Sequence, residues 1–406
     1  MRSIACIVCL CIAPVFADSP LPSDAVESIR VNQVIKSMHD AVNKVDVGAY
    51  MALVDPSDTF FLTEQRAWIT DLLEHPVEDI EIAIAWNEPV IAQDDGSAIA
   101  PIEITWHIEG EELDRHFAYP ARFEPVGAAD GRWVFVGRAW EFSDTAIPGV
   151  RIYADQLHED LAMLAGDRVA ILRETIASNF QRNTSVKDAK EIVVKIYPDM
   201  SSLQASIYLS YTDGLSGWNE PGESIKILGR TDFPQDKLDP LLGHEIGHSI
   251  SFEFGPEITK APWWALEGIA EVAAQLYRAT WNEKTHSVSE LAKSDNLRDW
   301  ELLADFRGEA NNHMMHVYLQ GWSMVDYISR VYGLPSRNEW FTSLANGASL
   351  NEASLETLEI SFDDLDTNWE NWLVNWTLPP EYKARLEEEK RKRELFSEQE
   401  NTTESD

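Results

Sequence analysis

The sequence has 406 residues, with 69 acidic and 33 basic side chains and a formal net charge of −36 at pH 7. A negative field of this size repels nucleic acid and anionic lipid, so we expect neither as a partner. The three cysteines all fall within the first 17 residues, which excludes a disulfide framework for the rest of the chain.

Residues 1–17 have the pattern of a secretory signal peptide. Arg2 supplies a positive charge, residues 4–16 are mostly apolar, and Val15 with Ala17 provides the small-residue cleavage pattern. The apolar stretch is shorter than the ~20 residues that span a bilayer. We therefore expect cleavage after Ala17, a secreted or periplasmic product, and no stable insertion in a membrane.

Residues 18–147 are expected to form a small α+β domain. Two segments with helical periodicity precede four segments of alternating apolar and polar residues, which is typical of strands joined by hairpins. The expected helices are Ala25–Lys44 and Thr63–Leu73, and the expected strands are Ile80–Trp86, Ala98–Glu109, Asp114–Pro125 and Trp133–Phe142. Helices followed by an antiparallel meander resemble the cone-like nuclear transport factor 2 fold. Such a domain could dock substrates, mediate dimerisation or inhibit a neighbouring enzyme.

Residues 148–380 are expected to form a second domain, with strands followed by mainly helical chain. The expected strands are Val150–Tyr153, Glu191–Tyr197, Ser206–Ser210 and Ile225–Leu228, and a long helix is expected at Ala162–Phe180. Trp369, Trp372 and Trp376 recur at helical spacing, which indicates a helix face packed on the domain. Residues 381–406 are charged and are expected to be a solvated helix and a disordered tail.

One stretch, residues 241–250, contains the pattern H-E-x-x-H. In a helix, a spacing of four residues places His244 and His248 on one face, one turn apart, where both can bind one zinc ion. Glu245 then lies beside the metal, where a water molecule would bind. Gly247 weakens a helix, so we expect close packing of a neighbouring element against it.

A third ligand follows at Glu267, after an interval of 18 residues. It lies in the segment Trp263–Glu271, which also has helical character. Three protein ligands with an open fourth position are typical of a catalytic zinc site, whereas a structural site is normally closed by four ligands. We therefore expect one zinc ion per chain, with another divalent ion as the alternative.

The pattern H-E-x-x-H-x18-E and the flanking W-x-x-E-G-x-A-E resemble the gluzincin zinc metallopeptidases of the peptidase MA-like group. This resemblance implies a thermolysin-like domain with a mixed sheet and a mainly helical C-terminal part. It also implies that His244, His248 and Glu267 bind zinc and that Glu245 is the general base.

The resemblance extends over most of residues 149–378. Residues 217–221 and the apolar Ile225–Leu228 resemble the loop and edge strand that precede the active-site helix. We therefore expect Ile225–Leu228 at the sheet edge nearest zinc, where it could bind an extended peptide as an added strand. The sequence before His244 lacks G-x-M-E-N, the element that holds a substrate's free amino terminus in the aminopeptidases. This difference favours an endopeptidase.

Two further residues are candidates for supporting roles. Glu271, four residues after Glu267, is expected to accept a hydrogen bond from the outer N–H of a zinc-binding histidine. By the resemblance, Tyr318 is expected to donate a hydrogen bond to the oxygen of the tetrahedral intermediate, with His313 and His316 as alternatives.

These patterns together predict an exported zinc metallopeptidase that hydrolyses peptide or protein substrates with a zinc-activated water. One alternative is a catalytically latent or degenerate zincin that acts as an exported binding protein. Another is a zymogen that residues 18–147 inhibit until they are removed. The sequence leaves the substrate and the oligomeric state open.

Overall fold

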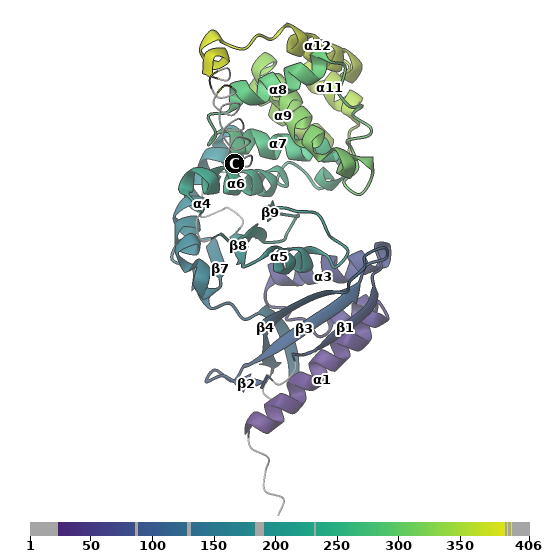
Figure 1. The fold of residues 1–406 in the computed structure, drawn as a ribbon, viewed down its shortest axis with the longest axis vertical. Helices are drawn as coiled ribbons and strands as arrows, with labels where there is room; N and C mark the ends of the chain where they lie inside the picture. The colour runs from purple at the N-terminus through teal and green to yellow at the C-terminus, as the bar shows by residue number, and fades with distance from the viewer. Residues whose placement is uncertain are drawn as a thin grey trace, which may run out of the picture. The chain divides into compact units, whose positions relative to one another are not determined.

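The chain divides into two compact units in the computed structural model (Figure 1). Unit 1 comprises residues 1–55 and 78–139, and unit 2 comprises residues 56–77 and 140–406. The expected signal peptide and most of the charged tail lie outside the described residues. The structure describes residues 23–85, 88–127, 131–182, 191–230 and 233–385, together with residues 388 and 391.

Unit 1 is an antiparallel sheet with the long helix α1 packed beside it (Figure 1). The strand order is β1–β3–β4–β5, and β2 pairs with β3. The core contains Val31 and Val42 of α1 and alternate residues of β3 such as Ile102 and Ile104. The elements are α1 (Ser23–Asn43), α2 (Val47–Met51), β1 (Glu78–Ile84), β2 (Ile91–Ala92), β3 (Ala98–His107), β4 (Arg115–Val126) and β5 (Arg132–Arg138). The alternating pattern thus predicted the long strands of this unit correctly.

Unit 2 contains a small sheet and a large helical part. In chain order its first elements are α3 (Thr59–Glu74), β6 (Phe142–Asp144), β7 (Val150–Ala154), η1 (Gln156–His158), α4 (Glu159–Asn179), β8 (Ile192–Tyr197), α5 (Met200–Ile207), β9 (Gly217–Trp218) and β10 (Ile225–Leu228). They are followed by α6 (Gln235–Ser251), η2 (Ile258–Lys260), α7 (Trp263–Gln275), α8 (Trp281–Lys293), η3 (Glu309–His313), α9 (Met314–Val331), α10 (Gly333–Ala345), α11 (Leu350–Leu358) and α12 (Phe362–Asn375).

The sheet of unit 2 is mixed, with strand order β6–β7–β8–β10–β9. The strands β7, β8 and β10 are parallel, and β6 and β9 pair antiparallel at the two edges. The prediction that Ile225–Leu228 forms an edge is therefore wrong, because β9 pairs with it through Gly217 and Trp218. A strand of two residues is too short for alternation to reveal it. The α+β fold with a mixed sheet and a mainly helical C-terminal part is confirmed.

The predicted strand at Ser206–Ser210 is also wrong, because the first part of it belongs to helix α5. Asp199 caps this helix by accepting a hydrogen bond from the backbone N–H of Ser202, at 2.8 Å. Leu203 and Ile207, four residues apart, are buried on one face of α5. The alternating residues at its end concealed this short helical period.

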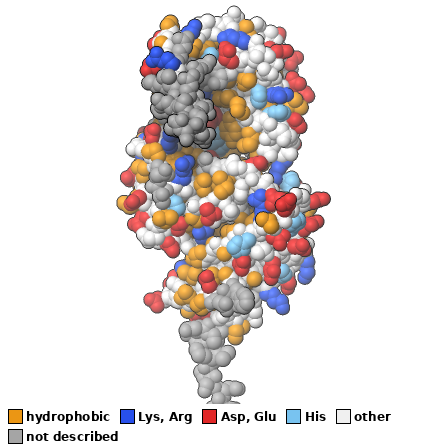
Figure 2. Space-filling model, viewed as in Figure 1, with side chains coloured by type: hydrophobic (Ala, Val, Ile, Leu, Met, Phe, Trp, Pro, Cys, Tyr) orange, Lys and Arg blue, Asp and Glu red, His pale blue; other side chains and the backbone are white. Residues whose placement is uncertain are grey.

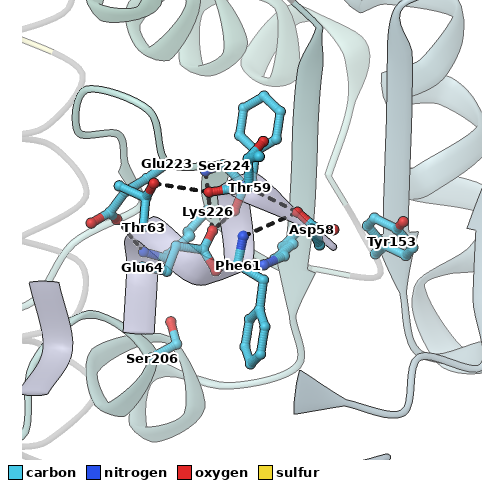
Figure 3. A network of polar contacts seen from close by, with 12 residues as sticks. Asp58, Thr59, Phe61, Thr63, Glu64, Tyr153, Ser206, Glu223, Ser224 and Lys226 are labelled. Atoms are coloured by element: carbon cyan, nitrogen blue, oxygen red, sulfur yellow. Dashed lines mark hydrogen bonds and ion pairs between the residues drawn. The ribbon is translucent and has the colours of Figure 1, made fainter. Parts of the chain in front are cut away.

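Helix α3 belongs to unit 2, although its sequence lies among the elements of the expected small domain. Its buried Glu64 accepts hydrogen bonds from Lys195 Nζ on β8, at 2.5 Å, and from the backbone N–H of Ser224, at 3.1 Å. Figure 3 shows Glu64 beside Ser224, close to the second buried ion pair of Glu223 with Lys226, which measures 2.6 Å. These contacts tie α3 to the mixed sheet of unit 2.

We expect Glu64→Ala to destabilise unit 2 by about 3–5 kcal/mol, because it leaves the ammonium of Lys195 buried without its carboxylate. Burial alone would raise the pKa of Glu64, but Lys195 and Lys226 reverse this and lower it, so the carboxyl is ionised at neutral pH. Unfolding in urea measures the decrease in the free energy of unfolding. The matched control is Glu74→Ala, which removes an exposed acid from the same helix. Equal midpoints for the two variants would contradict the prediction.

Tryptophans form much of the hydrophobic core in the helical part. Trp264, Trp322, Trp340 and Trp369 are almost fully buried. Trp369 donates a hydrogen bond from Nε1 to the hydroxyl of Ser323, at 3.1 Å. The aromatic spacing near residue 372 therefore marks a packed helix face, as predicted.

The surface in Figure 2 carries acidic side chains scattered over the visible face and not gathered in one patch. Among the described helices, none combines the length and hydrophobicity that crossing a bilayer requires.

Candidate metal centre

Close packing between α6, α7 and α9 brings the candidate residues together. A Cβ atom added to Gly247 of α6 would lie 2.8 Å from the Cβ of Ala273 in α7. A Cβ atom added to Gly268 of α7 would lie 2.6 Å from the carbonyl oxygen of Gly321 in α9. Glycine permits this approach, which a larger side chain would prevent. The three helices carry the histidine pair, the third predicted ligand and the candidate tyrosine.

Three buried ligand atoms converge between α6 and α7. His244 Nε2 lies 3.2 Å from His248 Nε2 and 3.2 Å from Glu267 Oε2. His248 Nε2 lies 3.5 Å from the same carboxylate oxygen. The group predicted from sequence spacing is therefore assembled, and it could hold a metal ion.

The geometry of this group fits a zinc ion. Zinc bonds to nitrogen and oxygen of ~2.0–2.1 Å in a tetrahedron place neighbouring ligand atoms about 3.3 Å apart. Glu267 Oε2 is buried and has no hydrogen-bond partner among the described residues. A buried carboxylate oxygen without a partner is costly, and a cation at this point would satisfy it. Two imidazoles and one carboxylate are also a donor set found in catalytic zinc sites.

Neighbouring side chains orient the ligands. The indole Nε1 of Trp263 donates a hydrogen bond to Glu267 Oε1 at 2.8 Å, which leaves Oε2 to face the histidines. His244 Nδ1 lies 3.0 Å from Glu271 Oε1 and donates its proton to this carboxylate, so Nε2 is the atom that would bind a metal once its own proton is displaced. Glu271 thus lies where the sequence predicted.

Glu271 is itself held by two cations that the sequence did not single out. Its Oε2 accepts hydrogen bonds from Arg278 at 2.8 Å and from Lys284 on α8 at 2.6 Å. Burial would raise the pKa of Glu271, but the hydrogen bond with His244 and the charge of Lys284 hold it well below its usual range. The carboxylate therefore stays ionised and can orient His244.

We expect Glu271→Gln to lower the affinity for zinc about 10- to 100-fold, because the uncharged amide holds His244 less firmly. Competition with a chromophoric chelator measures the dissociation constant. Glu339→Gln removes the same charge from an exposed position on α10 and should leave the affinity unchanged. If Glu271→Gln had the zinc affinity of the wild type, Glu271 would have no role in orienting His244 for metal binding.

The ligand group lies in the wall of a cavity of about 900 Å³. This volume is within the ordinary range for a ligand-binding pocket. Glu245 and Tyr318 line the same cavity. Glu245 is buried, and this burial raises the pKa of its carboxyl although His244 and His248 oppose the shift. A carboxylate with a raised pKa is a better proton acceptor.

Of the three candidate donors, Tyr318 is the one that lines the cavity among the described residues. Its ring centroid lies 5.8 Å from that of His244. Burial raises the pKa of Tyr318 well above its usual value, so the hydroxyl keeps its proton and can donate it to a hydrogen bond. His313 instead pairs with Glu309 at 3.2 Å, and neither His313 nor His316 is among the described residues that line the cavity.

Two residues of the cavity were not identified as functional candidates from the sequence, although both lie within residues 217–221. Asn219 is buried and donates a hydrogen bond to the backbone carbonyl of Glu245, at 2.9 Å. Burial and the charge of Glu223 raise the pKa of Glu220 to about 8, so its carboxyl holds a proton at neutral pH. Their only sequence signal was a pair of polar residues directly after a short Gly-Trp strand.

No protein-family model and no curated protein sequence matches this chain. The residues that converge on the cavity are therefore the basis for assigning a function.

Proposed function

We propose that this protein is a zinc metallopeptidase of the gluzincin type that cleaves peptide bonds within a chain. The observation that carries the proposal is the convergence of His244, His248 and Glu267 in the wall of a 900 Å³ cavity that also contains Glu245. Three ligands, a neighbouring carboxylate and room for a substrate are the parts that metal-assisted hydrolysis needs.

Zinc held by the three ligands would polarise the scissile carbonyl and lower the pKa of water to roughly 7. Glu245 accepts a proton from water as the water oxygen attacks the carbonyl carbon. It then transfers this proton to the leaving nitrogen as the C–N bond breaks. The hydroxyl of Tyr318 donates a hydrogen bond to the negatively charged oxygen that forms on the carbonyl carbon. Glu271 holds His244 in the tautomer that the reaction requires.

The preference for internal cleavage, and the export of the chain, rest on the sequence alone. The chain lacks the G-x-M-E-N element that binds a free amino terminus in related aminopeptidases. The signal-peptide pattern of residues 1–17 supports a secreted or periplasmic enzyme.

The zymogen alternative is not favoured by the contacts of α3 and β6. A cut at residue 147 would remove both elements, which belong to unit 2, and would leave Lys195 without Glu64. The degenerate-zincin alternative is not favoured by Glu245, which a non-catalytic metal site has no need to retain.

Cleavage of an unbiased peptide library by the zinc-loaded chain tests the proposal, with a chelated sample as the control. Internal cuts that disappear on chelation are expected, and their flanking residues would identify the subsites. Loss of single amino-terminal residues would mean an aminopeptidase. No cleavage by a chain shown to contain zinc would overturn the proposal in favour of a binding protein.

A further inference from the structure

The edge strand β9 runs directly against the Glu245 side chain. Gly217 pairs with Ile227 of β10 and also borders helix α6. A Cβ atom added to Gly217 would lie 2.8 Å from Glu245 Cδ and 3.1 Å from Cγ, and closer still to Oε1. The carboxylate of Glu245 therefore occupies the space that any side chain at position 217 would need.

The same strand is fastened to α6 two residues later. Asn219 donates hydrogen bonds from Nδ2 to the Glu245 carbonyl oxygen, at 2.9 Å, and to the hydroxyl of Ser249. In an extended chain, residues two apart point to the same side, so Gly217 and Asn219 both face the helix. Trp218 lies between them and points away from the helix.

Trp218 anchors the opposite side of the strand. Its ring contacts those of Tyr208, Tyr211 and Phe306, with centroids 5.9, 5.5 and 5.6 Å away. The strand is thus fixed by aromatic packing on one side and by hydrogen bonds to α6 on the other. Both sets of contacts fix the distance between strand β9 and Glu245.

We propose that Gly217 is a positioning residue for Glu245, with Asn219 setting the spacing between the strand and the helix. The inference rests on the proposed function of Glu245 as general base. The bare Cα of Gly217 lies against the carboxylate of Glu245, so the carboxylate keeps its position only while no side chain is present at position 217.

The effect of a methyl group at Gly217 differs from its effect at the glycines between helices. At Gly268 the added atom meets the backbone of α9, which cannot move without disturbing the fold. At Gly217 it meets the far end of one flexible side chain, which can rotate. Gly217→Ala should therefore keep the fold and displace the Glu245 carboxylate. A displacement of about 1 Å can cost 10²-fold in rate.

The test compares Gly217→Ala with Gly48→Ala, an exposed position on α2 that does not line the cavity and where an added Cβ atom makes only an ordinary contact, 3.5 Å from Asp46 Oδ1. We expect Gly217→Ala to lower kcat for peptide cleavage about 10- to 100-fold, with KM, zinc content and Tm close to those of the wild type. Gly48→Ala should match the wild type in kcat, KM and zinc content. In a Glu245→Gln background, Gly217→Ala should cause no further loss, because the group it displaces no longer accepts a proton.

Three results would overturn the inference. They are an unchanged kcat in Gly217→Ala, a rise in KM alone, or a further loss in the Glu245→Gln background. Absence of cleavage by the wild type would instead overturn the proposed function. Crystal structures of zinc-loaded wild type and Gly217→Ala then decide the positioning claim separately, because it requires the Glu245 carboxylate to move.

Discussion

Glu245→Gln is expected to lower kcat for peptide hydrolysis by about 10²- to 10⁴-fold, which is the usual contribution of a general base. Glutamine fills the same space but cannot accept the proton of the attacking water or deliver it to the leaving nitrogen. Because Glu245 is not one of the three converging ligands, the zinc content should be unchanged. Steady-state kinetics on a peptide from the library, with elemental analysis of the protein, measures both quantities.

The matched control is Asp236→Asn, which makes the same chemical change at an exposed position near the start of α6. It should retain the kcat of the wild type. If Glu245→Gln kept more than about a tenth of the wild-type kcat, proton transfer by this residue would be ruled out.

Removal of the metal is expected to abolish peptide cleavage and to destabilise the chain. A bound zinc ion contributes several kcal/mol to transition-state stabilisation, so His248→Ala or chelation should lower kcat by more than about 10³-fold. A metal that binds only the folded state also raises stability, by about 4 kcal/mol when its concentration is 1,000 times the dissociation constant. Calorimetry should therefore show a lower Tm after chelation, and added zinc should restore it.

The pH dependence of zinc binding provides a second test of the proposed metal site. Burial would lower the pKa of His244, but Glu267 and Glu271 outweigh this and raise it to about 10 in the metal-free chain. Zinc must displace the proton, so its affinity should rise with pH between 6 and 8. His286→Ala on α8 removes a histidine outside the cluster and should preserve the zinc affinity of the wild type. Wild-type cleavage that survived complete zinc removal would contradict the metal assignment.

The candidate metal-binding group could be predicted because helix geometry connects the spacing of its residues to their positions. The four-residue interval from His244 to His248 fixes their relative placement without any knowledge of the fold. Glu267 required only a second helix, which the helical character of Trp263–Glu271 indicated. The long strands of unit 1 were predictable for the same reason, since alternation is a local property.

Contacts between distant segments were not predictable from the sequence. Nothing in the sequence near Glu64 indicates that its partner is Lys195, 131 residues later. The sequence also does not indicate that Arg278 and Lys284 contact Glu271, because this pairing depends on how the helices pack. The contact of Gly217 with Glu245 depends on the packing of a two-residue strand against a helix, for which sequence periodicity offers no signal.

The membership of α3 in unit 2 has a consequence for the order in which the chain can fold. The chain passes between the two units three times, near residues 55, 77 and 139. Glu64 leaves the ribosome 160 residues before Ser224, so its carboxylate cannot reach this partner until all of unit 1 has been synthesised. Such long-range contacts form late and slow a fold that depends on them. Helix α3 is therefore synthesised early and lacks these partners until the strands of the mixed sheet have been made.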